Sequence, residues 1–180
     1  MPCAFMLDRI MARLASWRSW MAVGVLALAF SGCQYDPDAN LYVTTWPADR
    51  TVVGKYVLEE QRVDFGSKVS GAVYVTLRPD HRYEVENFPV WELACIAHYK
   101  LSKYWSGGGT WKVDVTGGMG NGWGKVQDIY GIQFDPPLQG TGSPGIGPHC
   151  DVTHEKSPHG LIIGYGDPDG GNSIRFEAVK

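Results

Sequence analysis

The sequence lacks an apolar run long enough to span a membrane, and it lacks a cluster of basic residues. Its longest apolar stretch, "MAVGVLALAF" at 21–30, has ten residues. Ten residues rise only about 15 Å as a helix, roughly half the hydrocarbon thickness of a bilayer. The chain carries 16 Lys and Arg against 19 Asp and Glu, whereas nucleic-acid binding needs a basic patch. A permanent transmembrane span and a nucleic-acid partner are therefore both disfavoured.

Recognisable catalytic motifs are also missing. No Gly-x-Ser-x-Gly is present, and Ser143 lies in the glycine-rich "GTGSPG" rather than after a strand. Glu59 and Glu60 are adjacent carboxylates, and Asp128 interrupts an apolar strand face. Sequence alone does not give the separation of carboxylates that hydrolysis or proton transfer requires. We therefore predict a solvated position for Asp128, no enzymatic activity and no cofactor.

The first 32 residues have the pattern of a signal peptide. Arg9, Arg13 and Arg18 supply a positive start, residues 21–30 supply the apolar centre, and Ser31-Gly32 supplies the small residues that a peptidase needs next to its cut. Removing residues 1–32 takes three arginines and one aspartate away, which leaves 13 basic and 18 acidic residues. The remaining chain is acidic and long enough for one domain.

"FSGC", residues 30–33, resembles the lipobox of bacterial lipoproteins. The resemblance implies that the thiol of Cys33 is acylated and that cleavage precedes it. Residues 33–48 are predicted to form a lipidated N-terminus and tether: "QYDPDAN", residues 34–40, is polar and rich in turn residues, and "LYVTTW", residues 41–46, is either part of the tether or a first strand. Gln34 resembles the sorting pattern of Gram-negative lipoproteins that reach the outer membrane and face the periplasm. The alternative is an ordinary cleavage site followed by a free cysteine, because both kinds of signal share this pattern.

Two cysteines, Cys95 and Cys150, remain for the folded domain, since Cys3 leaves with the signal and Cys33 is taken by lipid. In an oxidising compartment these two are predicted to form a disulfide. The bridge would close a loop of about 56 residues, which corresponds to roughly 4 kcal/mol in the chain-entropy model. The alternative makes Cys150 a metal ligand, and one cysteine cannot do both.

Strand patterns separated by turn residues run through most of residues 49–180. "GAVYVTLRPDHRYEVENF", residues 71–88, is the clearest hairpin, and "GTWKVDV" alternates Trp111, Val113 and Val115 on one side. Further strands are predicted at 51–60, 125–134, 161–166 and 173–179. Short strands without a βαβ pattern favour an all-β fold in which one antiparallel meander closes into a barrel of seven or eight strands.

Two segments interrupt this pattern. Residues 89–105 begin with Pro89 and place Val90, Leu93, Ala94 and Ala97 at helical spacing, which predicts one short helix or irregular insertion. Residues 136–160 are rich in Pro and Gly and have no periodicity, which predicts a long loop. The proposed disulfide would join these two segments.

The strand and turn motifs resemble those of small lipocalin-like β-barrel lipoproteins of bacterial envelopes. The motifs that carry the resemblance are "GKY" at 54–56, "LRPD" at 77–80, "GTW" at 109–111 and "GDPDGG" at 166–171. Lipocalins proper carry Trp where this chain has Tyr56. The resemblance implies the barrel architecture and no ligand.

Aromatic residues outside the strand alternation are candidates for a contact surface, because such residues are enriched at interfaces. They are Trp91, Tyr104, Trp105 and Trp123. The alternative is that they close the barrel ends as core, which is favoured for Trp105.

Histidines near Cys150 are weak candidates for a metal site: His149, His154 and His159. Their spacing matches no established site, so no metal is predicted.

The function predicted from these features is a non-enzymatic binding or interaction module anchored by lipid in the bacterial envelope. The module would present residues 89–105, 117–124 and 136–160 to an envelope protein or a small apolar ligand. One alternative is a barrel that inhibits an envelope or secreted protease by inserting residues 34–48 into its cleft. Another is a carrier with a hollow apolar interior.

Overall fold

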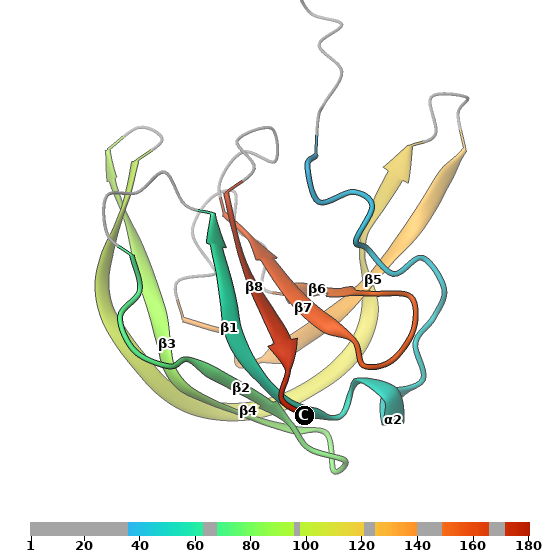
Figure 1. The fold of residues 1–180 in the computed structure, drawn as a ribbon, viewed down its shortest axis with the longest axis horizontal. Helices are drawn as coiled ribbons and strands as arrows, with labels where there is room; N and C mark the ends of the chain where they lie inside the picture. Colours follow the sequence, from blue (N-terminus) through green and yellow to red (C-terminus); the bar gives the residue numbers. More distant parts are fainter. Residues whose placement is uncertain (1–35, 63–67, 96–97, 121–124, 140–148, 166–171) are drawn as a thin grey trace, which may run out of the picture. The chain divides into compact units, whose positions relative to one another are not determined.

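In the part of the chain that the structure describes, eight antiparallel strands form one closed barrel in strand order, which confirms the predicted all-β meander (Figure 1). The structure is a computed structural model that describes residues 36–62, 68–95, 98–120, 125–139, 149–165 and 172–180. A single helical turn, α2 (Asp49–Val52), precedes the first strand. The strands are β1 (Gly54–Arg62), β2 (Tyr74–Leu77), β3 (Arg82–Cys95), β4 (His98–Gly120), β5 (Val126–Asp135), β6 (His149–Thr153), β7 (Gly160–Gly164) and β8 (Ser173–Ala178).

The helix or irregular insertion predicted at 89–105 is wrong, because these residues lie in β3 and β4. The two strands pair through Pro89↔Tyr104 and Trp91↔Leu101. Pro89 fits because β2 pairs with β3 only as far as Glu86, so the following part of β3 is bonded on one side, where proline is tolerated. Register shifts interrupt the alternation in this hairpin; at the shift between Val90 and Trp91 both adjacent side chains are buried.

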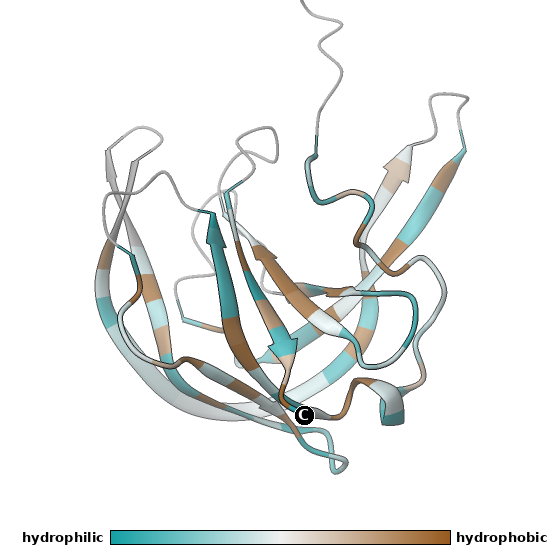
Figure 2. Ribbon diagram, viewed as in Figure 1, coloured by the Kyte–Doolittle hydropathy of each residue, from teal (hydrophilic) through white to brown (hydrophobic). Residues whose placement is uncertain are grey.

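The core fills the inside of the barrel with side chains from strands that are not adjacent in the sheet. Tyr83 of β3 packs edge-on against Phe134 of β5, with ring centroids 4.7 Å apart. Phe88 of β3 stacks with Phe176 of β8 at 6.3 Å. These pairs join strands that are not neighbours in the sheet, so the rings meet across the interior. Figure 2 shows apolar and polar residues alternating along the strands, because successive side chains point in turn to the inside of the barrel and to solvent.

The hairpin of β4 and β5 extends beyond the barrel wall. Alternation along the two strands predicts that Trp111, Val113 and Val115 face inward together with Val126. Trp111 and Val113 are buried, but Val115 is 48% and Val126 is 70% exposed, so the prediction is wrong for these two valines. β6 pairs with β5 only between Gly131 and Gln133, so the rest of the hairpin leaves the ring. We call residues 115–120 and 126–130 the β4–β5 arm; it points to the upper right in Figure 1.

Residues 36–48, the N-terminal segment, belong to the folded domain, so the predicted tether over 33–48 is wrong for the part that the structure describes. Val43 is buried and lies between two strands that diverge: its N–H donates to Val152 O of β6 at 3.0 Å, and Tyr130 N of β5 donates to Val43 O at 3.1 Å. His154 N also donates to Leu41 O at 3.0 Å. The segment therefore bonds to both strands where the β5–β6 ladder ends, and the domain includes residues before 49.

The predicted disulfide is wrong, because Cys150 carries a free and buried thiol. Cys150 lies opposite Ile132, which in turn lies opposite Val113 of β4, whereas Cys95 pairs with His98 at the other end of β4. Val113 and His98 are separated along β4 by on the order of 50 Å of extended strand. A disulfide needs Cα atoms within about 7 Å. Burial also raises the pKa of the Cys150 thiol, which makes it unreactive.

Candidate functional site

A chain of alternating charges runs over the outside of the barrel where β1 and β8 close the ring. A β-bulge at Glu59 makes it possible: β1 and β8 pair as Val57↔Glu177 on one side of the register shift and as Glu60↔Arg175 and Arg62↔Ser173 on the other. The extra residue reverses the alternation of side chains along β1, so that Glu60 lies on the outer face opposite Arg175. We call the group the seam network; it consists of Asp38, Glu60, Arg62, His154, Arg175 and Glu177.

One half of the seam network centres on Arg175 of β8. Arg175 Nη2 lies 2.6 Å from Glu60 Oε2, and Arg175 Nε lies 3.4 Å from Glu177 Oε1. His154 Nε2 lies 3.2 Å from both carboxylate oxygens of Glu177. Arg175 is thus held between two carboxylates, and Glu177 between a guanidinium and an imidazole.

The other half attaches the N-terminal segment to the barrel through Asp38. Arg62 Nη1 donates to Asp38 Oδ1 at 2.8 Å, and Ser173 Oγ donates to Asp38 Oδ2 at 3.1 Å. Arg62 Nε donates to Glu60 Oε1, also at 2.8 Å. Because a buried carboxylate is costly unless it is paired, these donors are what allow the Asp38 side chain to be only 4% exposed.

The hydrogen bond from Arg62 lowers the pKa of the Glu60 carboxyl; burial opposes the change, and the charges of Arg175 and Arg62 add to it. The same bond raises the pKa of Arg62. Both groups are therefore held in their charged forms. The network is satisfied mainly by its own members, which is typical of a structural ion-pair network.

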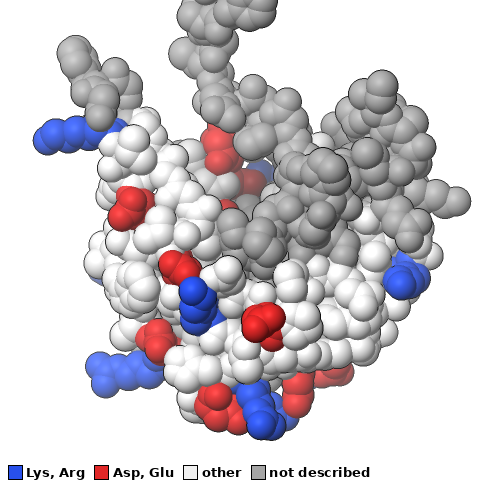
Figure 3. Space-filling model, turned by 180° about the vertical axis from the view of Figure 1, so that it is seen from behind, with Lys and Arg blue, Asp and Glu red and all other residues white. Residues whose placement is uncertain are grey.

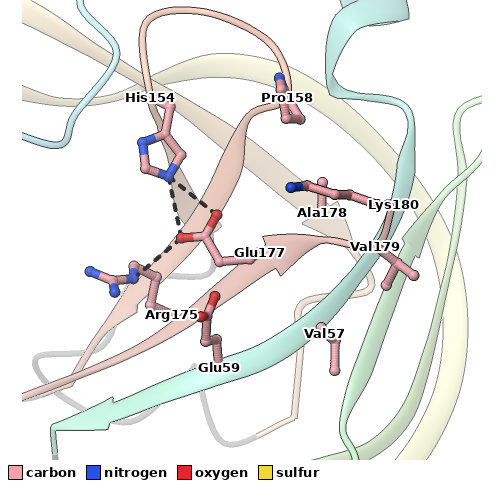
Figure 4. A pocket seen from close by; sticks show the side chains of 9 residues that line it. All are labelled: Val57, Glu59, His154, Pro158, Arg175, Glu177, Ala178, Val179 and Lys180. Carbon is pink, nitrogen blue, oxygen red and sulfur yellow. Dashed lines mark hydrogen bonds and ion pairs between the residues drawn. The ribbon is translucent and has the colours of Figure 1, made fainter.

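An open depression of about 660 Å³ lies beside the His154 end of the network (Figure 4). Its lining combines charged and apolar side chains: Val57, Glu59, His154, Pro158, Arg175, Glu177, Ala178, Val179 and Lys180. The His154–Glu177 pair could exchange a proton, but none of the lining residues is a serine, cysteine or threonine that a base could activate. The lining places charges of both signs beside apolar side chains, an arrangement that could recognise a group of mixed charge.

The candidate metal residues do not converge. His159 is buried, its Nδ1 donates to His154 O at 2.7 Å, and its Nε2 lies 3.1 Å from Thr51 Oγ1 of α2. His159 therefore joins the β6–β7 connection to α2, while His154 faces Glu177. His149 begins β6, and its side chain is outside the described residues. Within the described ranges, no three His, Cys, Asp or Glu side chains group together as metal ligands would.

The predicted aromatic surface is only partly exposed. Trp91 is core, so its predicted surface position is wrong: it lies on β3, 1% exposed, with its ring 6.2 Å from that of Tyr165. Trp105 is half-buried, and its ring leaves no room for a side chain at Gly107. Tyr104 is exposed, and its hydroxyl accepts a hydrogen bond from Ser70 N at 2.9 Å. Trp123 lies outside the described residues.

Sequence reasoning missed Asp38, Arg62 and Trp46. Asp38 lies in the stretch that the sequence predicts to be a tether, and no local signal shows that it meets Arg62 in space. Trp46 is 55% exposed and packs edge-on against Tyr130 at 5.2 Å.

Asp128, predicted to be solvated, is exposed. Figure 3 shows acidic and basic residues interspersed over the rear face, without a large patch of one sign among the described residues.

Comparisons with known proteins do not assign the chain to a family: no family model matches it, and no curated protein or solved structure matches it either. Among the residues that the structure describes, no helix has the length and hydropathy needed to cross a bilayer.

Proposed function

We propose that the protein is a lipoprotein of the bacterial cell envelope, anchored through acyl chains on Cys33 and acting as a non-enzymatic binding or interaction module. The observation that carries the proposal is the order of a positive start, an apolar centre and the small residues Ser31-Gly32 directly before Cys33. Two or three acyl chains, at about 0.8 kcal/mol per buried methylene, are enough to hold a domain at a membrane.

The described surface supports a binding role better than catalysis. The seam network pairs its charges internally, and the lining of the open depression beside it contains no serine, cysteine or threonine that His154 could activate. The carrier alternative has little support, because aromatic rings from strands that are not adjacent in the sheet meet inside the barrel and occupy its interior. The protease-inhibitor alternative requires a free N-terminal segment, whereas Val43 and Asp38 are buried against the barrel.

Acylation can be tested with Cys33→Ser, with Cys3→Ser as the matched control in the same leader. In cells given radioactive palmitate, we expect the wild type and Cys3→Ser to incorporate label and to sediment with membranes. Cys33→Ser should lose the label and accumulate as uncleaved precursor. Label on Cys33→Ser equal to that of the wild type, or no label on the wild type, would overturn the anchor.

The predicted destination, the periplasmic side of the outer membrane, rests on Gln34. Gln34→Asp should move the protein from outer- to inner-membrane fractions on a density gradient, with Gln34→Asn as the control. An unchanged distribution for Gln34→Asp would contradict sorting by this residue.

A further inference from the structure

The β4–β5 arm has one exposed face that carries apolar side chains. Val115 lies opposite Tyr130, and Gly120 lies opposite Val126, so these positions share a face of the two strands. Val126 is 70% exposed and Val115 is 48% exposed. Trp46 packs against Tyr130 on the arm. The face continues the inner surface of the barrel after the strands have left the ring, which is why apolar residues meet solvent there.

The base of this arm is bonded to the start of the N-terminal segment. Tyr42 donates from its hydroxyl to Asp36 Oδ2 at 2.8 Å, and the next residue, Val43, accepts a hydrogen bond from Tyr130 N at 3.1 Å. Asp38 N also donates to Asp36 Oδ1 at 2.8 Å. Asp36 is therefore fixed about one tyrosine side chain away from the arm.

Asp36 follows Cys33 by three residues, so the acylated residue is close to the arm by covalent length alone. Three residues reach at most about 11 Å. The arm extends four residues beyond Tyr130, to Val126, which is about 13 Å of strand. In Figure 1 the start of the described chain and the free end of the arm are both at the upper side of the barrel. The arm and the anchor can therefore reach the same surface.

We propose that the exposed face of the β4–β5 arm lies against the surface of the bilayer that holds the acyl chains. This inference rests on the proposed anchor at Cys33. Trp and exposed aliphatic side chains favour the headgroup region, where one side of the residue is apolar and the other is wet. Asp128 shares the face, and Lys125 is exposed next to Val126. Zwitterionic headgroups carry an ammonium group and a phosphate, which accommodate the charges of Asp128 and Lys125. Because these two charged side chains stay among the headgroups, the arm contacts the membrane surface only shallowly.

The consequence is a fixed orientation rather than added affinity. The acyl chains supply the binding free energy, and the arm decides which side of the barrel faces the lipid. The C-terminal end of β8, with Val179 bonded to Lys55 O, and the depression beside it would then remain open to a partner in solution.

A photo-crosslinking amino acid placed at Val126 tests the proposal, with Val179 as the control because it is an exposed valine outside the arm. The full-length protein would be made in cells, and both variants would be checked for palmitate label and membrane sedimentation. On irradiation, the Val126 variant should give several-fold more lipid adduct than the Val179 variant. Equal adducts, or none from Val126, in protein that is labelled and sediments with membranes would overturn the arm contact while leaving the anchor in place.

Loss of both label and sedimentation in the wild type would instead overturn the proposed function, and this inference with it. A second measurement needs no substitution in the arm. Amides of Gln127 and Ile129 should exchange hydrogen several-fold more slowly in the acylated protein on vesicles of phosphatidylethanolamine and phosphatidylglycerol than in Cys33→Ser protein made without residues 1–32, which carries neither leader nor acyl chains. Unchanged exchange at both amides would contradict the contact.

Discussion

Arg62 Nη1 lies 2.8 Å from Asp38 Oδ1, and this contact joins β1 to the N-terminal segment. The Asp38 side chain is 4% exposed and that of Arg62 is 39% exposed. Removing the arginine would leave a buried carboxylate with one hydroxyl donor, Ser173 Oγ. Breaking a buried ion pair is more costly than breaking a surface pair, because the remaining charge stays desolvated.

Arg62→Ala should therefore lower the free energy of unfolding by about 2–3 kcal/mol, less than for a fully buried pair because Arg62 is partly solvated. The matched control is Arg78→Ala, which removes a surface pair with Glu84 at 2.8 Å and should cost less than about 1 kcal/mol. Urea denaturation of both variants gives the comparison. Equal small losses would show that Asp38 does not depend on Arg62.

Acid should weaken the fold through Glu60, whose carboxyl pKa is lowered in the folded state from its ordinary value of 4.5. A carboxyl with a lowered folded pKa contributes stability above its unfolded pKa, and this contribution is lost as pH falls through the folded pKa. Glu60→Gln should therefore flatten the fall in melting temperature below pH 4.5. Glu84→Gln is the control at an exposed pair. An unchanged acid slope in Glu60→Gln would contradict the contribution of Glu60.

The barrel was predictable because its signals are local. Alternation places Trp111 and Val113 on one face of a strand, and both are buried. The β3–β4 hairpin was not predictable in the same way, because a register shift between Val90 and Trp91 leaves both of these adjacent residues buried, which breaks the alternation expected of a strand. A bulge changes the period of the pattern from which the prediction was made.

The N-terminal segment, the seam network and the free thiol depend on contacts between residues far apart in the chain. Nothing near Asp38 in the sequence indicates that Arg62 binds it, and nothing near Val43 indicates that β5 and β6 separate around it. The disulfide prediction failed for the same reason. It paired Cys95 with Cys150 by elimination, whereas the strand register keeps them apart.

Cys150 should behave as a protected free thiol. Burial raises its pKa, so little thiolate forms at neutral pH. Iodoacetamide should leave Cys150 unmodified in the native protein and should alkylate it in denaturant without any reductant, as measured by peptide mass spectrometry. Cys150→Ala provides the control for assigning the modified peptide. A requirement for reductant would mean that the cysteine is oxidised, which would contradict the free thiol.

Val43 should be the most sensitive position of the N-terminal segment, because it is 1% exposed and bonds to β5 and β6 at once. Val43→Ala removes buried methyl groups from a site where β5 and β6 are separated, so the two strands cannot move together to fill the cavity. The substitution should therefore lower the free energy of unfolding by about 2 kcal/mol. Val126→Ala, the same change at an exposed position, should stay within about 0.5 kcal/mol.

Hydrogen exchange separates the two ways in which Val43→Ala could act. If the segment closes the gap between β5 and β6, the amides of Tyr130 and His154, which donate to Val43 O and Leu41 O, should exchange faster in the variant. The amide of Trp111, which donates to His81 O at another part of the barrel, should change only with global stability. Equal acceleration at all three amides would mean that Val43 supports the whole core rather than the junction, and no acceleration at Tyr130 would mean that the segment does not hold the strands together.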